Sequence, residues 1–430
     1  MIRFLHIIIY ILLANVCLWA QRVAPVSGSG LTSSSSSAEY LRPSQNQLGD
    51  TIISIVNFYP GSEIYELEGH SVLRVRSLGC DMAYSYGTFD FNAPNFVYRY
   101  VKGETDYWIS AIPWNIFVYG YIDQGRRIVE HVLDMTPEQK HRLLDLLAQN
   151  LQPANRTYRY NYVRDNCATR PLHIVEQALN DSIVLAAPTE GSQGDEETFR
   201  SIMQHYHANY PWYQFGIDLA LGPGIDKVLN TREKAFAPVV LDSQLDEATV
   251  SGNPLILKTN IINDTLDNNA VLDPTPWYLT PLAVCWTFFA LTLLVCILDI
   301  VRRRPSRWFY SLTSTIYGLA GVLVWFLVLI SEHEATSPNY LMVWLNPLWL
   351  LAAVLIWTAG TRRAASWIFA AEALATLVLM LIWPLLDQCT NAAFWPLMLA
   401  AVISGAVCAS LLYRRPSAIN NNNKKPTARK

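Results

Sequence analysis

The stretch RDNCATRP, residues 164–171, places a single cysteine between polar residues and a proline. Before it, TYRYNYV (157–163) alternates aromatic and polar residues, which is typical of a strand. After it, LHIVEQAL (172–179) has the apolar spacing of a helix. Pro171 fits the first helical turn, because the N–H group that proline lacks has no partner there. The stretch therefore predicts that a strand ends, and a helix begins, at Cys167.

A thiol at the start of a helix lies near the positive end of the helix dipole and near free backbone N–H groups. Both features lower the pKa of a thiol, and the N–H groups can also stabilise a developing oxyanion. Cys167 is therefore a candidate nucleophile. Two other interpretations stay open. Cys167 could form a disulfide with Cys80, with Cys389 as a further candidate for pairing, or it could be a buried residue with no chemical role.

A thiol nucleophile needs a base, and the histidines before residue 275 are the candidates, at positions 70, 131, 141, 173, 205 and 207. His70 follows Gly69 and opens the strand-like stretch SVLRVRS, so its ring can project from a strand end toward a neighbouring helix. His173 points to another face of the helix that follows Cys167. We therefore predict His70 as the base, with a structural or surface role as the alternative.

The part of the chain before residue 275 has the pattern of an α+β domain. Several short runs between residues 51 and 91 are β-branched and aromatic or alternate in polarity, which predicts strands. The stretch TPEQ (136–139) is typical of a helix start, and this helix is expected to end before Pro153. In the later segment 198–241, Asp218 and Asp226 could support the site or cap helices, and we favour helix caps.

After residue 275 the composition changes to long apolar runs with few charges. Each run is long enough to cross the hydrocarbon core of a bilayer, which is roughly 30 Å thick. We predict five spans, approximately at residues 278–300, 308–330, 340–359, 364–386 and 393–413.

Lys and Arg follow the first, third and fifth runs, whereas the loops 331–339 and 387–393 contain neither. By the positive-inside rule, the basic loops lie in the cytoplasm and these two loops lie on the periplasmic side of the inner membrane. Residues 1–20 are typical of a secretory signal or a signal anchor, so the domain that follows is exported.

The balance of 32 Lys+Arg against 35 Asp+Glu does not indicate a nucleic-acid partner.

The expected organisation has six parts. They are a signal peptide or anchor (1–20), a flexible linker (21–50), a periplasmic catalytic domain (51–241), a connector (242–276), a membrane domain (277–413) and a basic cytoplasmic tail (414–430).

Several motifs resemble one protein family. EGHSVLRV (68–75), YSYGTFDF (84–91), residues 155–171 and GIDLALG (216–222) look like the periplasmic domain of the Lnb-type lipoprotein N-acyltransferases of Bacteroidota. The spans, with NPLWLL (346–351), are similar to the membrane domain of that family. The order of a histidine before an Asn-Cys helix start also resembles the permuted papain-like, NlpC-type proteins, which include lecithin retinol acyltransferase. The resemblance thus implies a permuted papain-like cysteine fold before a five-helix bundle.

The resemblance implies acyl transfer by Cys167 and His70. The thiol would attack an acyl ester of a membrane phospholipid, and the thioester would pass the chain to the α-amine of a diacylglyceryl-cysteine lipoprotein. Asn166 and Arg170 are expected to support the nucleophile, and Tyr86 is suggested as the residue that orients His70. The sequence contains no zinc-ligand spacing and no phosphate-binding loop, so no metal or cofactor is expected.

Polar residues on the periplasmic side of the spans are the predicted lipid-binding groups. His333, Glu334 and Asn339 lie in one outer loop, and Asn346 lies inside the third span. They are expected to hold a lipid headgroup or the acceptor amine, with simple solvation as the alternative. Glu372 lies within the fourth span, which indicates a function, or an interaction with the cytoplasmic interface.

Two other functions remain open at this stage. A membrane-anchored cysteine peptidase or amidase acting on cell-wall peptides would use the same Cys167 and His70. Five spans weigh against it, because a hydrolase of soluble substrates needs only one anchor. A non-enzymatic envelope protein, in which Cys167 is structural, is the second alternative.

Overall fold

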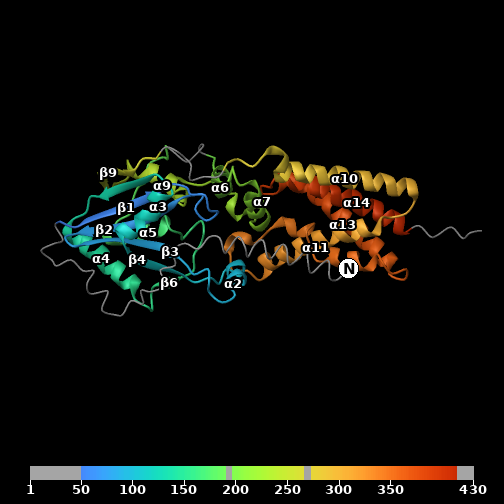
Figure 1. Cartoon of the computed structure of the whole chain (residues 1–430), viewed down its shortest axis with the longest axis horizontal. Helices are drawn as coiled ribbons and strands as arrows, with labels where there is room; N and C mark the ends of the chain where they lie inside the picture. Colours follow the sequence, from blue (N-terminus) through green and yellow to red (C-terminus); the bar gives the residue numbers. More distant parts are fainter. Residues whose placement is uncertain (1–49, 190–195, 266–272, 414–430) are drawn as a thin grey trace, which may run out of the picture. The chain divides into compact units, whose positions relative to one another are not determined.

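A computed structural model describes residues 50–189, 196–265 and 273–413 of the chain. The predicted signal or anchor (1–20), nearly all of the linker (21–50) and the basic tail (414–430) lie outside the described residues. The described chain contains a domain built on a sheet, followed by a region of long apolar helices (Figure 1).

Seven antiparallel strands form the main sheet, in the order β6-β4-β3-β2-β1-β5-β9. The three strands expected within residues 51–91 are present and lie side by side. The strands are β1 (Ile52–Phe58), β2 (His70–Ser77), β3 (Cys80–Thr88), β4 (Tyr107–Pro113), β5 (Ile128–Leu133), β6 (Thr157–Tyr158) and β9 (Ile256–Asn263).

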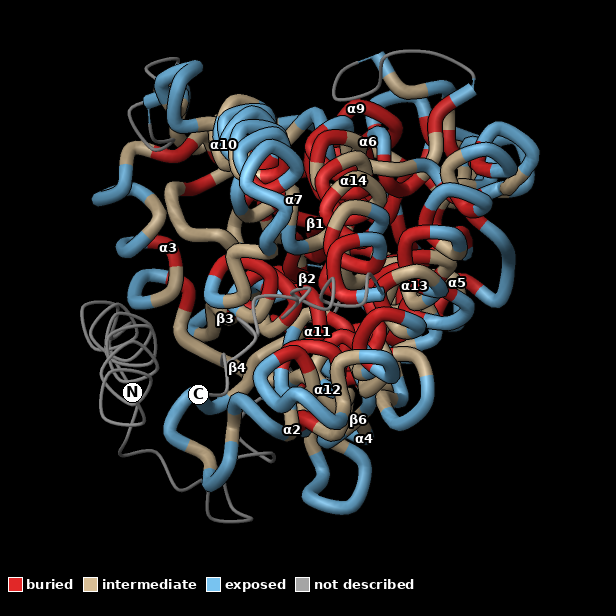
Figure 2. Tube along the Cα trace, turned by 90° about the vertical axis from the view of Figure 1, so that its right-hand side faces the viewer, coloured by how far each residue is buried: buried red, intermediate tan, exposed pale blue. Residues whose placement is uncertain are grey.

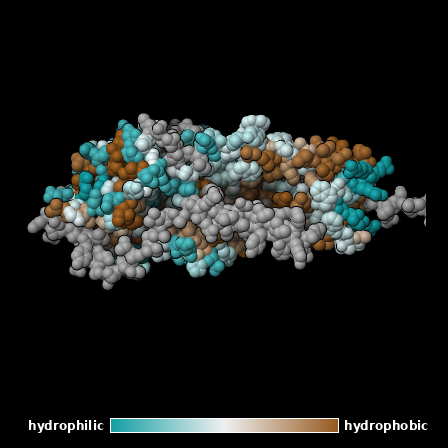
Figure 3. Space-filling model, in the orientation of Figure 1, coloured by the Kyte–Doolittle hydropathy of each residue, from teal (hydrophilic) through white to brown (hydrophobic). Residues whose placement is uncertain are grey.

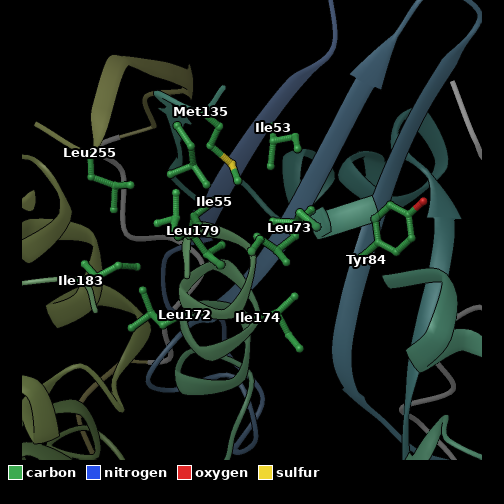
Figure 4. Close-up of a cluster of buried hydrophobic side chains, with 14 of the residues drawn as sticks. Ile53, Ile55, Leu73, Tyr84, Met135, Leu172, Ile174, Leu179, Ile183 and Leu255 are labelled. Carbon is green, nitrogen blue, oxygen red and sulfur yellow. The ribbon is translucent and has the colours of Figure 1, made fainter. Parts of the chain in front are cut away.

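Residues of one strand alternate between two cores, because successive side chains of a strand point to opposite faces. On one face, Ile53, Leu73 and Tyr84 pack with the helices α4 (Pro137–Leu151) and α5 (Thr169–Leu179), as Figure 4 shows in part. On the other face, Val56 and Val72 pack with α3 (Trp114–Asp123). The predicted start of α4 is confirmed, since Thr136 and Gln139 form a reciprocal capping box.

Residues 242–276 are not simply a connector, and this corrects our domain boundary. Helix α9 (Pro238–Leu245) is buried along its whole length, and β9 pairs with β5 as an edge strand of the sheet. We missed β9 because none of its eight residues is buried, so its sequence lacks the apolar face of a central strand. The sheet domain therefore extends to Asn263.

Short elements complete the sheet domain and the loops of the membrane region. They are α2 (Phe96–Lys102), α6 (Phe199–Tyr206), α7 (Pro211–Ala220), η2 (Pro223–Ile225), α8 (Thr231–Lys234), β7 (Thr249–Val250), β8 (Asn253–Pro254), η3 (Trp277–Leu279), η4 (Glu334–Thr336), η5 (Tyr340–Val343) and η6 (Trp383–Leu385).

Within the described residues, four helices are long and apolar enough to cross a membrane. They are α10 (Pro281–Arg302), α11 (Arg307–Leu329), α13 (Arg362–Ile382, with η6 following) and α14 (Phe394–Tyr413). Much of α10 is exposed and hydrophobic, as a surface in contact with lipid requires (Figures 2 and 3).

The third predicted span, residues 340–359, is not one long helix. It consists of η5 and the short helix α12 (Leu348–Leu355), separated at Asn346 and Pro347. Proline cannot continue the backbone hydrogen bonds of a helix, and the Asn346 Oδ1 atom accepts the N–H group of Leu348 instead. Gly321 of α11 packs closely against this break. A Cβ atom at residue 321 would lie only 2.4 Å from the backbone nitrogen of Asn346, so a larger residue would not fit there. A count of apolar residues overlooks such a break.

The orientation of the helices predicts the labelling of Cys389, an exposed free thiol in the second outer loop. If that loop lies in the periplasm, a membrane-impermeant maleimide will modify Cys389 in cells whose outer membrane alone is permeable. Mass spectrometry of the peptide that contains Cys389 measures the labelling, and a Cys389→Ser variant is the control. Labelling only after the inner membrane is broken would contradict this orientation.

Candidate active site

Cys167 lies directly before α5, and the side chain of Asn166 holds it there. Asn166 Oδ1 accepts hydrogen bonds from the backbone N–H groups of Ala168 (2.9 Å) and Thr169 (3.0 Å). Its Nδ2 atom donates to two backbone carbonyl groups, one of them at Phe236, 2.8 Å away. Asn166 is buried and caps the start of the helix, so it positions Cys167.

Arg170 supports the same turn from the other side. Its guanidinium group binds Asp165 through two hydrogen bonds, of 2.8 and 2.7 Å. The guanidinium carbon also lies 3.5 Å from the centroid of the Tyr158 ring, a cation–π contact. Arg170 therefore fixes the segment on which Cys167 lies.

Three donors surround the sulfur atom of Cys167. The Tyr160 hydroxyl group lies 3.8 Å from Sγ, and the backbone N–H groups of Ser71 and of Cys167 itself also favour the thiolate. Burial is nevertheless the largest effect and raises the pKa of the Cys167 thiol. The N–H groups do act to lower this pKa, as expected for a helix start, but burial outweighs them.

His70 is the first residue of β2 and the neighbour of Ser71 in the chain. Its Nε2 atom lies 2.8 Å from the Oγ atom of Ser85, and its ring stacks with Tyr121 at a centroid distance of 6.5 Å. Burial, together with the positive charge of Arg126, lowers the pKa of His70 to about 3. The imidazole is therefore neutral at physiological pH.

The two predicted catalytic residues lie on adjoining elements, but no hydrogen bond joins their side chains among the residues that the structure describes. The ring of Tyr121 stacks on His70, and burial raises the pKa of its hydroxyl group. Within the same described residues, the Nδ1 atom of His70 has no hydrogen-bond partner, whereas Nε2 is bound to Ser85.

Ser85, and not Tyr86, contacts His70. The Tyr86 hydroxyl group accepts a hydrogen bond of 2.9 Å from Asn150 in α4, on the opposite face of the sheet. This follows from the alternation of side chains along β3, which puts residues 85 and 86 on different faces. The alternating sequence Tyr84-Ser85-Tyr86 already indicated that Ser85 and Tyr86 face opposite sides of the sheet. The contact between Ser85 and His70 could be predicted only by knowing that β3 pairs with β2.

The outer loop between α11 and α12 is bound to the sheet domain. His333 Nε2 donates to the carbonyl group of Tyr100 (2.8 Å). Glu334 accepts hydrogen bonds from Asn161 (3.2 Å) and Arg164 (3.3 Å), the latter only three residues before Cys167. Of these two predicted lipid-binding residues, Glu334 thus contacts the segment before the thiol, whereas His333 contacts α2.

The other two predicted lipid-binding residues also have partners within the chain. Asn339 donates to the carbonyl group of Leu219 in α7 (3.0 Å). Asn346 donates to Glu372 at 2.9 Å, so Glu372 is buried against this break and does not reach toward the cytoplasmic interface.

Asp218 and Asp226 do not act as helix caps, which corrects our interpretation. Both bind Arg200, at 2.7 Å each, and all three side chains are buried. Asp218 also accepts a hydrogen bond from Asn391 in the second outer loop (2.8 Å). Sequence alone could not reveal this cluster, because its members are far apart in the chain.

A second polar cluster lies next to the candidate site and was not predicted. Glu68 accepts a hydrogen bond from the Tyr162 hydroxyl group, and His207 Nε2 lies 2.7 Å from the same carboxylate oxygen.

Cys80, Cys167 and Cys389 are all free, so neither of the disulfides considered above is present.

The chain matches two protein-family models, the Lnb N-terminal periplasmic domain over residues 42–204 and the Lnb transmembrane domain over residues 273–416. The chain therefore belongs to the Lnb family, as the motifs around His70 and Cys167 indicated. A search of curated proteins and a search of solved structures gave no match. Family membership indicates a membrane enzyme of lipoprotein processing with a periplasmic N-terminal domain.

The raised pKa of the thiol predicts how Cys167 reacts with iodoacetamide. Only the thiolate is alkylated, so the rate should rise roughly tenfold per pH unit between about pH 7 and pH 9. His70 stays neutral over this range, so the plot of alkylation rate against pH should show no inflection near the ordinary pKa of histidine. Mass spectrometry of the Cys167 peptide measures the rate.

Protein unfolded in SDS is the control for this measurement, because it lacks the burial that raises the thiol pKa. It should be alkylated faster at neutral pH. Rapid alkylation of the folded protein at neutral pH would contradict the burial argument.

Proposed function

We propose that this protein is a lipoprotein N-acyltransferase, which moves an acyl chain from a membrane phospholipid through Cys167 to the α-amine of a diacylglyceryl-cysteine lipoprotein. One observation carries the proposal: the segment that bears the thiol is bound, through Arg164 and Glu334, to an outer loop between apolar helices. A nucleophile held at this place suits substrates that are anchored in the outer leaflet.

In the first half-reaction, the Nδ1 atom of His70 takes the thiol proton while Nε2–H donates to Ser85. The sulfur atom attacks the ester carbonyl group of the lipid, so a C–S bond forms and a C–O bond breaks. The imidazolium returns its proton to the departing lysophospholipid oxygen. The N–H groups of Ser71 and Cys167 and the Tyr160 hydroxyl group are suited to stabilise the oxyanion.

In the second half-reaction, the lipoprotein amine attacks the thioester carbonyl group. A C–N bond forms, the C–S bond breaks, and the proton of the amine returns to the thiolate by way of His70. Exclusion of water favours the amine as acceptor, and burial of Cys167 supplies that exclusion.

Substitution of the thiol tests this function. Membranes with the wild-type protein should add a third acyl chain to a diacylated lipoprotein, and Cys167→Ser and Cys167→Ala membranes should not. Mass spectrometry of the lipoprotein N-terminus measures the acylation state, and thermal unfolding checks that both variants fold. An acceptor that stays diacylated with the wild-type protein would refute the proposal and leave hydrolysis of cell-wall peptides to be examined.

Ser85 should act as a positioning residue for His70. Ser85→Ala removes the hydrogen bond that holds the Nε2 atom of the imidazole, so kcat should fall roughly tenfold to a hundredfold while KM for the lipid changes little. Tyr86→Phe is the matched control, since its hydroxyl group contacts Asn150 on the other face of the sheet. Equal losses of activity in the two variants would contradict this role.

A further inference from the structure

Helix α2 has a composition that packing within the sheet domain does not explain. None of its seven residues is buried. Val97, Tyr98 and Tyr100 are 65%, 55% and 49% exposed. An apolar, aromatic surface of this kind on a short helix marks a contact with another apolar phase or partner.

The contacts of α2 place it beside the end of one of the long apolar helices. The carbonyl group of Val101 accepts a hydrogen bond from the Ser331 hydroxyl group, and that of Lys102 accepts one of 2.7 Å from the N–H group of Glu332. The ring of Tyr98 lies 6.1 Å from that of Phe326, near the end of the apolar helix α11. Helix α2 is therefore held at the level where a membrane span meets the periplasm, the depth that tyrosine side chains favour.

A row of aromatic rings leads from α2 to the thiol. Phe96 of α2 stacks on Phe89 at a centroid distance of 5.8 Å, and Phe89 lies 5.2 Å from Tyr107. Tyr107 stacks on Tyr160 at 4.7 Å, and the Tyr160 hydroxyl group contacts the sulfur atom of Cys167. The four rings come from four segments: the residue after β3, helix α2, strand β4 and the loop after β6. They form a continuous row that ends at the Tyr160 hydroxyl group.

We propose that this aromatic row, Phe96-Phe89-Tyr107-Tyr160, binds the acyl chain of the donor phospholipid and guides its ester group to Cys167. The inference rests on the proposed acyl transfer and adds the path by which the lipid enters. The apolar ring faces suit methylene groups, and the Tyr160 hydroxyl group lies where the ester carbonyl group has to stop. Helix α2 takes the chain from the bilayer, because Val97 and Tyr98 are exposed beside the row.

Photocrosslinking tests this path without requiring turnover. Full-length Cys167→Ala protein is placed in nanodiscs of phosphatidylethanolamine in which a fraction of the lipid carries a diazirine at the end of one acyl chain. Crosslinks mapped to the peptides of Phe89 and Tyr107, in addition to those on the membrane helices, are the expected result. Crosslinks confined to the membrane helices and the exposed face of α2 would overturn the proposal.

Two exposed residues give a matched pair of variants for the same experiment. Val97→Asp places a charge beside the row, and should reduce crosslinking to Tyr107 roughly tenfold, a difference of about 1.4 kcal/mol. Leu257→Asp places the same charge on β9, at the opposite edge of the sheet, and should leave that yield unchanged. Equal yields in the two variants would also overturn the proposal.

The acylation assay separates this inference from the proposed function. Transfer by the wild-type protein without crosslinks to the row would refute the row alone. Crosslinks to the row in a protein that transfers no acyl chain would refute the acyltransferase, and with it the role of the row in guiding an ester to the thiol.

Discussion

The position of the thiol depends on one buried amide. Asn166 uses both ends of its side chain: the oxygen closes the start of α5, and the nitrogen binds carbonyl groups before and after the helix. A buried amide with all these partners tolerates little displacement, because each lost hydrogen bond leaves a polar atom unsatisfied. Cys167, the next residue, is thereby fixed against the first residues of β2, where Ser71 and His70 lie.

Sequence predicted those features that depend on neighbours in the chain. Local patterns predicted the capping box of α4, the strands of residues 51–91 and the start of α5, which lies two residues after Cys167. The strand expected over residues 157–163 covers only Thr157 and Tyr158. Features set by partners far away were missed, such as the pairing of β9 with β5 and the contact of Ser85 with His70. The break at Pro347 was missed for a different reason, since mean hydropathy over a long window conceals a single residue that cannot continue a helix.

The described structure holds a neutral pair of residues at the candidate site. Burial acts in opposite directions on the two groups, raising the pKa of Cys167 and lowering that of His70, so both effects disfavour a thiolate–imidazolium pair. The donors around the sulfur atom become useful only when negative charge develops there. A protonated, buried thiol is also protected from oxidants in the periplasm, because oxidation requires the accessible thiolate.

The buried cluster of Arg200 and Asp218 has a consequence for biosynthesis. Asp218 leaves the ribosome well before its partner Asn391, which lies 173 residues later in the chain and just before α14. Until that helix has been inserted, a carboxylate oxygen in the interior lacks one of its hydrogen bonds. The buried cluster therefore reaches its complete native structure only after the segment that carries Asn391 has been inserted, which couples maturation of the exported domain to insertion of the later helices.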